Sequence, residues 1–231
     1  KTGTGKTLGF AIPLLMDTLG PGEEGWDEDP ASGSPQALVI LPTRELAKQV
    51  AEELSTAAAK RTVRIVQVYG GRAYEPQIED LERGAEVVVG TPGRLIDLMD
   101  RGVLDLTHVT TVVLDEADEM LDLGFLPDVE KILARTRADR HTMLFSATMP
   151  GAVVALARRY MTRPTHIRAQ DPGDEGMTVQ TVQQVVYRTH SMNKVEVVSR
   201  ILQAEGRGRT IIFARTKRTA ARVADDLRSR G

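Results

Sequence analysis

The sequence lacks cysteine entirely. Disulfides, thiolate metal sites and cysteine nucleophiles are therefore excluded, and the absence fits a reducing compartment, so we expect a cytoplasmic protein. The sequence also lacks an apolar run long enough to cross a bilayer, so we expect no membrane segment. A surplus of basic residues is missing as well, because the formal net charge is -2. Any nucleic-acid binding must then come from a local patch.

The composition is that of an ordinary globular protein, with 41% hydrophobic and 27% charged residues among 231. Short apolar runs predict strands at residues 37–41, 63–68, 86–89, 109–114 and 142–145. Longer amphipathic stretches predict helices at residues 7–19, 45–58, 74–83, 94–101, 127–135 and 152–160. This alternation predicts an α/β fold with a mostly parallel sheet covered by helices on both faces. Ligands of such sheets collect at the carboxyl ends of the strands.

Two segments, residues 20–35 and 169–180, interrupt this pattern. We interpret the first as a surface loop and the second as a linker between a first domain, residues 1–168, and the opening of a second α/β domain, residues 181–231. In the second domain we expect strands at 181–187 and 210–214 and helices at 194–204 and 217–230. The chain starts inside a phosphate-binding loop and stops before the second sheet could close, so we expect a sequence truncated at both ends.

A run at the start of the chain is typical of the end of a phosphate-binding loop: Thr2, Gly3, Thr4, Gly5, Lys6 and Thr7. The two glycines let backbone amides approach a phosphate, and the helix that begins near Lys6 presents its positive end. Lys6 would reach the β and γ phosphates, and the Thr7 hydroxyl would bind Mg²⁺. The alternative is a turn rich in glycine and threonine before a helix.

Four residues, Asp115-Glu116-Ala117-Asp118, directly follow the predicted strand 109–114. Asp115 can hold Mg²⁺, usually through water, and Glu116 can polarise the water that attacks the γ phosphate. Alternatively, these acids only favour the N-terminus of a helix. Together with the phosphate-binding loop they predict nucleotide hydrolysis.

These motifs and five others occur in an order that resembles the DEAD-box RNA helicases, over nearly the whole chain. The other motifs are Pro42-Thr43-Arg44-Glu45-Leu46-Ala47, Gly70-Gly71, Thr91-Pro92-Gly93-Arg94, Ser146-Ala147-Thr148, and Ile211-Ile212-Phe213 with Arg215 and Thr216. The resemblance implies two RecA-like domains that close on ATP, Mg²⁺ and single-stranded RNA. It implies Glu116, Asp115 and Lys6 as catalytic residues, and hydrogen bonds from Ser146 and Thr148 to Asp118 that couple the nucleotide to RNA.

The resemblance also implies RNA binding without sequence readout, because amides, hydroxyls and arginines suit a sugar-phosphate backbone. The RNA-binding residues would be Pro42, Thr43, Arg44, Gly70, Gly71, Thr91, Pro92, Gly93, Arg94, Arg215 and Thr216. A purely structural alternative stays open for several of the motif residues: Thr43 and Pro92 suit helix starts, and Ser146 and Thr148 suit a helix cap.

We therefore expect the parent protein to be a monomeric ATP-dependent RNA helicase, with protein partners undefined. The family's adenine-recognition segment and its arginines for the transferring phosphate lie outside this sequence, so we expect the 231 residues alone to be nearly inactive. Two alternatives remain. One is an ATP-gated RNA clamp or scaffold without unwinding, and the other is a DNA translocase or an unrelated ATPase with a phosphate-binding loop.

Overall fold

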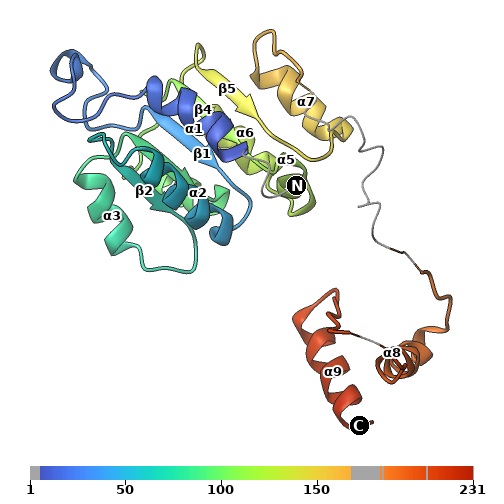
Figure 1. Cartoon of the computed structure of the whole chain (residues 1–231). Helices are drawn as coiled ribbons and strands as arrows, with labels where there is room; N and C mark the ends of the chain where they lie inside the picture. The colour runs from blue at the N-terminus through green and yellow to red at the C-terminus, as the bar shows by residue number, and fades with distance from the viewer. Residues whose placement is uncertain (1–5, 168–182, 184, 207, 231) are drawn as a thin grey trace. The chain divides into compact units, whose positions relative to one another are not determined.

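The computed structural model describes residues 6–167, 183, 185–206 and 208–230. The chain divides into two compact units, Lys1–His166 and Ile167–Gly231, which we call the first and the second unit (Figure 1). Among the residues described, no helix combines the length and the apolar character needed to cross a bilayer.

The first unit is built on a five-stranded parallel sheet with the strand order β2-β3-β1-β4-β5. Its strands are β1 (Ala37–Ile40), β2 (Ile65–Val68), β3 (Val87–Gly90), β4 (Thr111–Leu114) and β5 (His141–Leu144). All five were predicted from the apolar runs, with ends that differ by up to two residues. The expected parallel α/β sheet is confirmed.

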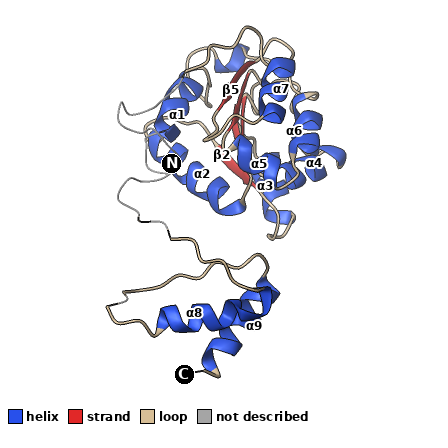
Figure 2. Ribbon diagram, turned by 90° about the vertical axis from the view of Figure 1, so that its right-hand side faces the viewer, coloured by secondary structure: helices blue, strands red, loops and turns tan. Residues whose placement is uncertain are grey.

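Seven helices of the described part cover this sheet. They are α1 (Lys6–Met16), α2 (Arg44–Ala57), α3 (Glu75–Glu82), α4 (Pro92–Asp100), α5 (Ala117–Asp122), α6 (Leu126–Leu133) and α7 (Gly151–Tyr160). Helix α5 was not predicted as an element, and the others agree with the amphipathic stretches. Figure 2 shows helices on both sides of the strands.

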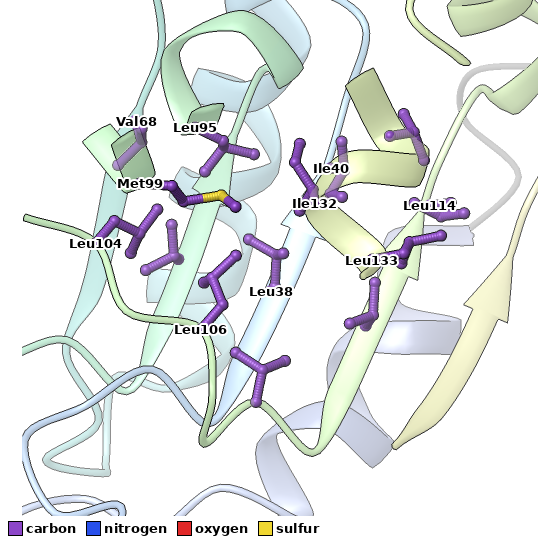
Figure 3. Close-up of a cluster of buried hydrophobic side chains, with 14 of the residues drawn as sticks. Leu38, Ile40, Val68, Leu95, Met99, Leu104, Leu106, Leu114, Ile132 and Leu133 are labelled. Carbon is purple, nitrogen blue, oxygen red and sulfur yellow. The ribbon is translucent and has the colours of Figure 1, made fainter. Parts of the chain in front are cut away.

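Successive side chains of the buried strands alternate between two apolar clusters, one on each face of the sheet. Leu38 and Ile40 of β1 pack in one cluster with Leu95 of α4 and Ile132 of α6 (Figure 3). The residues between them, Ala37 and Val39, pack in a second cluster with residues of α1 and α2. Because successive side chains of a strand point to opposite faces, a strand buried on both faces reads as a continuous apolar run.

The predicted surface loop at residues 20–35 is tied to the domain by polar side chains. Gln36 accepts a hydrogen bond from the Leu19 amide at 2.8 Å and donates to the Leu19 carbonyl at 3.0 Å. The guanidinium of Arg61 donates to a carboxylate oxygen of Glu23 at 2.9 Å. The loop also contains a short 3-10 helix, Trp26–Glu28. It is therefore an anchored surface loop.

The second unit is described as helices: a short 3-10 helix (Ser191–Asn193), α8 (Lys194–Leu202) and α9 (Lys217–Arg228). The two helices were predicted, but the strand prediction at 210–214 is wrong, because these residues form no strand and Phe213 is 90% exposed. The described residues of 181–187 form no strand either, and 181, 182 and 184 lie outside the description. A strand needs a neighbour for its backbone hydrogen bonds, and the described part of this unit has none to offer.

Gly90, the last residue of β3, has no room for a side chain. A Cβ atom there would lie 2.5 Å from the Val68 carbonyl oxygen and 2.9 Å from a methyl carbon of Leu95. We expect Gly90→Ala to lower the free energy of unfolding by about 1–3 kcal/mol through overpacking, measured by urea denaturation. Gly151→Ala is the matched control, because nothing lies within 4 Å of its Cβ position. Equal stability of the two variants would contradict this description of the β3 end.

Candidate functional site

The strands of the first unit end in one row, so the segments after them begin at the same edge of the sheet. Ile40 of β1 lies in register with Gly90 of β3 and with Leu114 of β4, and Leu114 is in register with Leu144 of β5. The hydrogen-bond ladder continues one residue further: the amides of Leu41, Asp115 and Phe145 bond to carbonyls of neighbouring strands at 2.8–3.1 Å. The motif residues of this unit therefore start side by side.

Lys6, at the start of α1, lies against the two carboxylates that follow β4. Its Nζ donates a hydrogen bond to Glu116 Oε1 at 2.8 Å and lies 3.7 Å from Asp115 Oδ1. The lysine of the predicted phosphate-binding loop and the predicted metal and water ligands thus meet across 110 residues of sequence. This contact places both halves of the predicted nucleotide site together.

The ionisation of these groups reflects their burial and their mutual contact. Burial raises the pKa of Asp115, which is only 6% exposed, and the positive charge of Lys6 opposes that rise. Burial by itself would lower the pKa of Lys6, but the hydrogen bond with Glu116 and the charges of both carboxylates raise it above its ordinary value. Lys6 is therefore held as a cation beside an acid that needs a nearby cation to stay charged.

Glu116 adopts a left-handed backbone conformation, with φ 55° and ψ 50°, at the sharp turn from β4 into α5. A residue with a side chain pays about 1–2 kcal/mol for this conformation. Two hydrogen bonds hold the turn: the Glu116 amide donates to Asp115 Oδ1 at 2.9 Å, and the Ala117 amide donates to the Phe145 carbonyl at 3.1 Å. The turn brings two consecutive carboxylates to Lys6.

Asp118, Ser146 and Thr148 form a hydrogen-bonded cluster between α5 and the segment after β5. The Thr148 amide and hydroxyl both donate to Asp118 Oδ2, at 2.9 and 2.8 Å. The Asp118 amide donates to Ser146 Oγ at 3.1 Å, and Ser146 Oγ donates to the Thr148 carbonyl at 2.6 Å. Burial raises the pKa of Asp118, but the bonds from Thr148 and Ser146 outweigh it and leave the pKa below its usual range. Neither hydroxyl caps α7, which begins at Gly151 after Pro150, but Ser146 Oγ accepts a hydrogen bond from an amide in the first turn of α5.

A second group of motif residues gathers at the ends of β1 and β2. Thr43 caps α2, where its hydroxyl accepts a hydrogen bond from the Leu46 amide at 3.4 Å. Arg44 is exposed and pairs with Glu45 at 2.6 Å. Gly71 has a φ of 78°, and a Cβ atom on it would lie 3.1 Å from Arg44 Nη1. The Arg44 motif and the Gly70-Gly71 motif thus lie next to each other.

The motif after β3 contributes less exposed surface than its sequence suggested. Thr91 stands at the N-cap of α4 without a capping bond from its side chain, and Pro92 is buried in the first turn. Arg94 is only 8% exposed, and both its Nη atoms lie 3.1 Å from the Arg72 carbonyl oxygen. Of the two motif arginines in this unit, only Arg44 presents its guanidinium to solvent.

Four predicted residues of the phosphate-binding loop, Thr2, Gly3, Thr4 and Gly5, lie outside the described residues. Arg215 and Thr216 belong to the second unit, where the Thr216 hydroxyl caps α9 by accepting a hydrogen bond from the Thr219 amide at 3.1 Å.

Sequence reasoning missed Gln77, a fully buried polar side chain of α3. Its Oε1 accepts a hydrogen bond from the Tyr69 amide at 3.0 Å, and its Nε2 donates to the Ala73 carbonyl at 2.8 Å. A signal was present, because Gln77 shares the inner face of α3 with Tyr74, Ile78 and Leu81 at helical spacing.

The donors near Lys6 fit a magnesium nucleotide. Mg²⁺ prefers hard oxygen ligands and is usually held by one or two protein groups together with phosphates and water. The Thr7 hydroxyl and the Asp115 carboxylate are such groups. No group of three or more acidic or histidine side chains that could hold a metal ion without phosphates occurs among the described residues.

Comparison with known proteins finds relatives that match the whole length of the chain. A family model described as DEAD/DEAH box helicase matches residues 1–156. The chain is 43% identical over 231 residues to the DEAD-box ATP-dependent RNA helicase CshA of Geobacillus kaustophilus, covering 100% of the chain and 47% of that protein. It is 43% identical over 232 residues to the ATP-dependent RNA helicase DeaD of Escherichia coli, covering 100% of the chain and 35% of that protein. The chain thus spans less than half the length of these relatives.

Among solved structures, a DEAD box protein from Methanococcus jannaschii matches with a TM-score of 0.67 and 37% identity, covering 100% of this chain and 58% of that one. A hypothetical ATP-dependent RNA helicase from Sulfolobus tokodaii matches with a TM-score of 0.60 and 40% identity, covering 71% of this chain and 44% of that one. The expected RecA-like α/β fold of the first unit is confirmed.

The cluster around Asp118 generates a prediction about pH. Because the pKa of Asp118 is lowered in the folded state, its contribution to stability is present above the unfolded pKa and is lost as the pH falls through the folded pKa. Thr148→Val removes one of the bonds to the carboxylate. We expect a higher pKa of Asp118, measured by NMR titration, and a loss of about 0.5–1 kcal/mol at neutral pH that shrinks in acid.

Thr136→Val is the control for this variant, because the Thr136 hydroxyl donates to a backbone carbonyl, that of Leu133, and not to a carboxylate. Its effect on stability should not depend on pH. If Thr148→Val left the pKa of Asp118 unchanged, the described contacts would not be those that hold the carboxylate in its charged form.

Proposed function

The chain belongs to the DEAD/DEAH box helicase family, and we propose that its parent protein works as an ATP-dependent RNA helicase. It would bind ATP with Mg²⁺, hold the backbone of single-stranded RNA and separate short RNA duplexes as its domains close. The observation that carries the proposal is the contact of Lys6 with Glu116 and Asp115 at the carboxyl edge of a parallel sheet. Substrates of such sheets bind at this edge.

In the nucleotide site, Lys6 would exchange partners when ATP binds. Its ammonium group now bonds to Glu116 and lies near Asp115, and the phosphates of ATP offer it a larger negative charge. The residues that surround the phosphates would be Thr2, Gly3, Thr4, Gly5, Lys6 and Thr7. Mg²⁺ would supply positive charge that stabilises the negative charge on the phosphates. Thr7 and Asp115 are the groups that would hold the ion, Asp115 partly through water.

Glu116 would then act as the general base of ATP hydrolysis. Once Lys6 leaves it for the phosphates, its carboxylate is free to accept a proton from the attacking water. Glu116 directly follows Asp115, the residue proposed to hold the metal, and the left-handed turn lies between β4 and α5 at this point. Water and metal would therefore be presented to the same phosphate. A change in this site would be transmitted to the RNA-binding loops through Asp118, Ser146 and Thr148, because their hydrogen bonds join α5 to the segment after β5.

RNA would lie across the loops at the ends of β1, β2 and β3. The motif residues there are Pro42, Thr43, Arg44, Gly70, Gly71, Thr91, Pro92, Gly93 and Arg94. In the second unit, Arg215 and Thr216 are the residues proposed to contact RNA. These residues offer amides, hydroxyls and cations and no pattern that pairs with base edges, which favours binding without sequence readout. The names of the relatives favour RNA over DNA, and contacts to the 2′-hydroxyl are the physical means of that choice.

Glu116→Gln tests the assignment of the base. The amide keeps the shape of the side chain and can still bond to Lys6 but accepts no proton. We expect ATP affinity to be retained, turnover in the parent protein to fall by about 10²- to 10⁴-fold, and RNA to dissociate slowly, measured by steady-state ATPase assay and RNA release. Glu119→Gln, three residues along, is the control and should turn over normally. A Glu116→Gln variant with normal turnover would refute the base.

A substrate comparison tests the activity itself. The parent protein should separate a short RNA duplex only with ATP and Mg²⁺, and RNA should stimulate its ATPase more than DNA of the same sequence. RNA-stimulated hydrolysis without strand separation would favour the clamp. Equal stimulation by DNA would favour a translocase.

A further inference from the structure

The loop from β2 to α3, residues 69–74, is held by two buried polar side chains, those of Gln77 and Arg94. Gln77 bonds to the Tyr69 amide and the Ala73 carbonyl, and so fixes both ends of the turn that contains Gly70 and Gly71. Arg94 of α4 places both its Nη atoms on the Arg72 carbonyl between them. The backbone of this loop is therefore fixed from inside the domain.

The guanidinium of Arg94 is also packed against an aromatic ring. Its Cζ lies 3.8 Å from the centre of the Tyr74 ring, and Arg101 Cζ lies 4.1 Å from the same centre. The Tyr74 hydroxyl in turn donates a hydrogen bond to Asp97. Because Arg94 is also only 8% exposed, its guanidinium offers little accessible surface to a ligand.

Arg72 has the opposite environment. Its side chain is exposed and makes no hydrogen bond or ion pair with any residue that the structure describes. It follows Gly71, whose Cβ position lies 3.1 Å from Arg44 Nη1, so its backbone adjoins the exposed Arg44. Glu45 is paired with Arg44, Asp97 is bonded to Tyr74, and no ion pair joins Arg72 to Glu75, three residues along the chain. Among the described residues, Arg72 is thus an exposed cation without an ion-pair partner.

We propose that Arg72 is a further contact to an RNA phosphate, and that Arg94 and Gln77 are positioning residues that hold its backbone. This inference rests on the RNA binding proposed above and adds to it a residue that lies outside the helicase motifs. It also changes the role proposed for Arg94 from a direct RNA contact to positioning of the Arg72 backbone. The two arginines thus have different roles. Arg72 provides a positive charge at the surface, and Arg94 binds the Arg72 carbonyl with both Nη atoms inside the domain.

The two tasks predict opposite tolerance to lysine. Arg72→Lys keeps a point charge that can meet a phosphate, so RNA affinity should stay within about twofold. Arg72→Ala should weaken binding by about 3- to 10-fold and make the dependence of log Kd on log salt shallower by about 0.7, the value for one contact to a single strand. Arg94→Lys keeps its charge but loses the fork and the stacking, so it should bind RNA as weakly as Arg72→Ala.

The measurement is binding of the parent protein to a labelled ten-nucleotide oligouridine, followed by fluorescence anisotropy at several salt concentrations. Mg²⁺ and a non-hydrolysable ATP analogue are present. Arg83→Ala is the matched control, because the side chain of this exposed arginine at the far end of α3 bonds to Asp80 and to the Glu79 carbonyl, both in its own helix. It should bind like the wild type. The double variant Arg72→Ala with Arg94→Lys should bind no more than about twofold more weakly than either single variant, since both lose the same contact.

Arg72→Ala binding like Arg83→Ala, with the same salt dependence, would overturn the inference. Losses that multiply in the double variant would also overturn it, because Arg94 would then contact RNA independently. Since Arg72 is exposed, its variants keep the test valid even if Arg94→Lys lowers the melting temperature. A wild-type parent protein that fails to bind RNA while the nucleotide is bound would refute the proposed function itself, and this outcome is thereby distinguished from failure of the Arg72 contact alone.

Discussion

The parallel pairing of equal, four-residue strands without offset is the constraint on which the rest of the first unit depends. Because β1, β3, β4 and β5 end in one row, the segments that carry the motifs all leave the sheet at the same edge. A shift of one residue in any pair would also exchange the two apolar layers that flank the sheet. Packing of the core and assembly of the site are therefore the same requirement.

At this edge, electrostatics concentrates on Lys6. The lysine compensates two carboxylates that follow a buried strand, and one of them stands in a strained left-handed turn. Strained conformations persist only where the surroundings hold them, here through the bonds of Glu116 to Asp115 and of Ala117 to Phe145. Lys6 is also the proposed partner of the ATP phosphates. Binding of the nucleotide would therefore move Lys6 from Glu116 to the phosphates and free the Glu116 carboxylate to act as the base.

Much of this arrangement was predictable from local patterns. Strands buried on both faces read as apolar runs, Pro92 marked the start of α4, and Thr43 marked the start of α2. What could not be predicted depends on contacts between distant residues. The burial of Arg94 follows from the Arg72 carbonyl 22 residues away, which no periodicity reveals. The strand expected at 210–214 failed for the converse reason, since a run such as Ile211-Ile212-Phe213 becomes a strand only beside a partner strand.

The most direct test of the central claim is a crystal structure of the chain with Mg²⁺ and a non-hydrolysable ATP analogue. The account predicts that Lys6 Nζ leaves Glu116 and lies about 2.7–3.2 Å from phosphate oxygens, with the metal ion on the side of Asp115. A structure in which Lys6 stays on Glu116 while the phosphates are bound, or in which the phosphates lie away from this edge of the sheet, would contradict it.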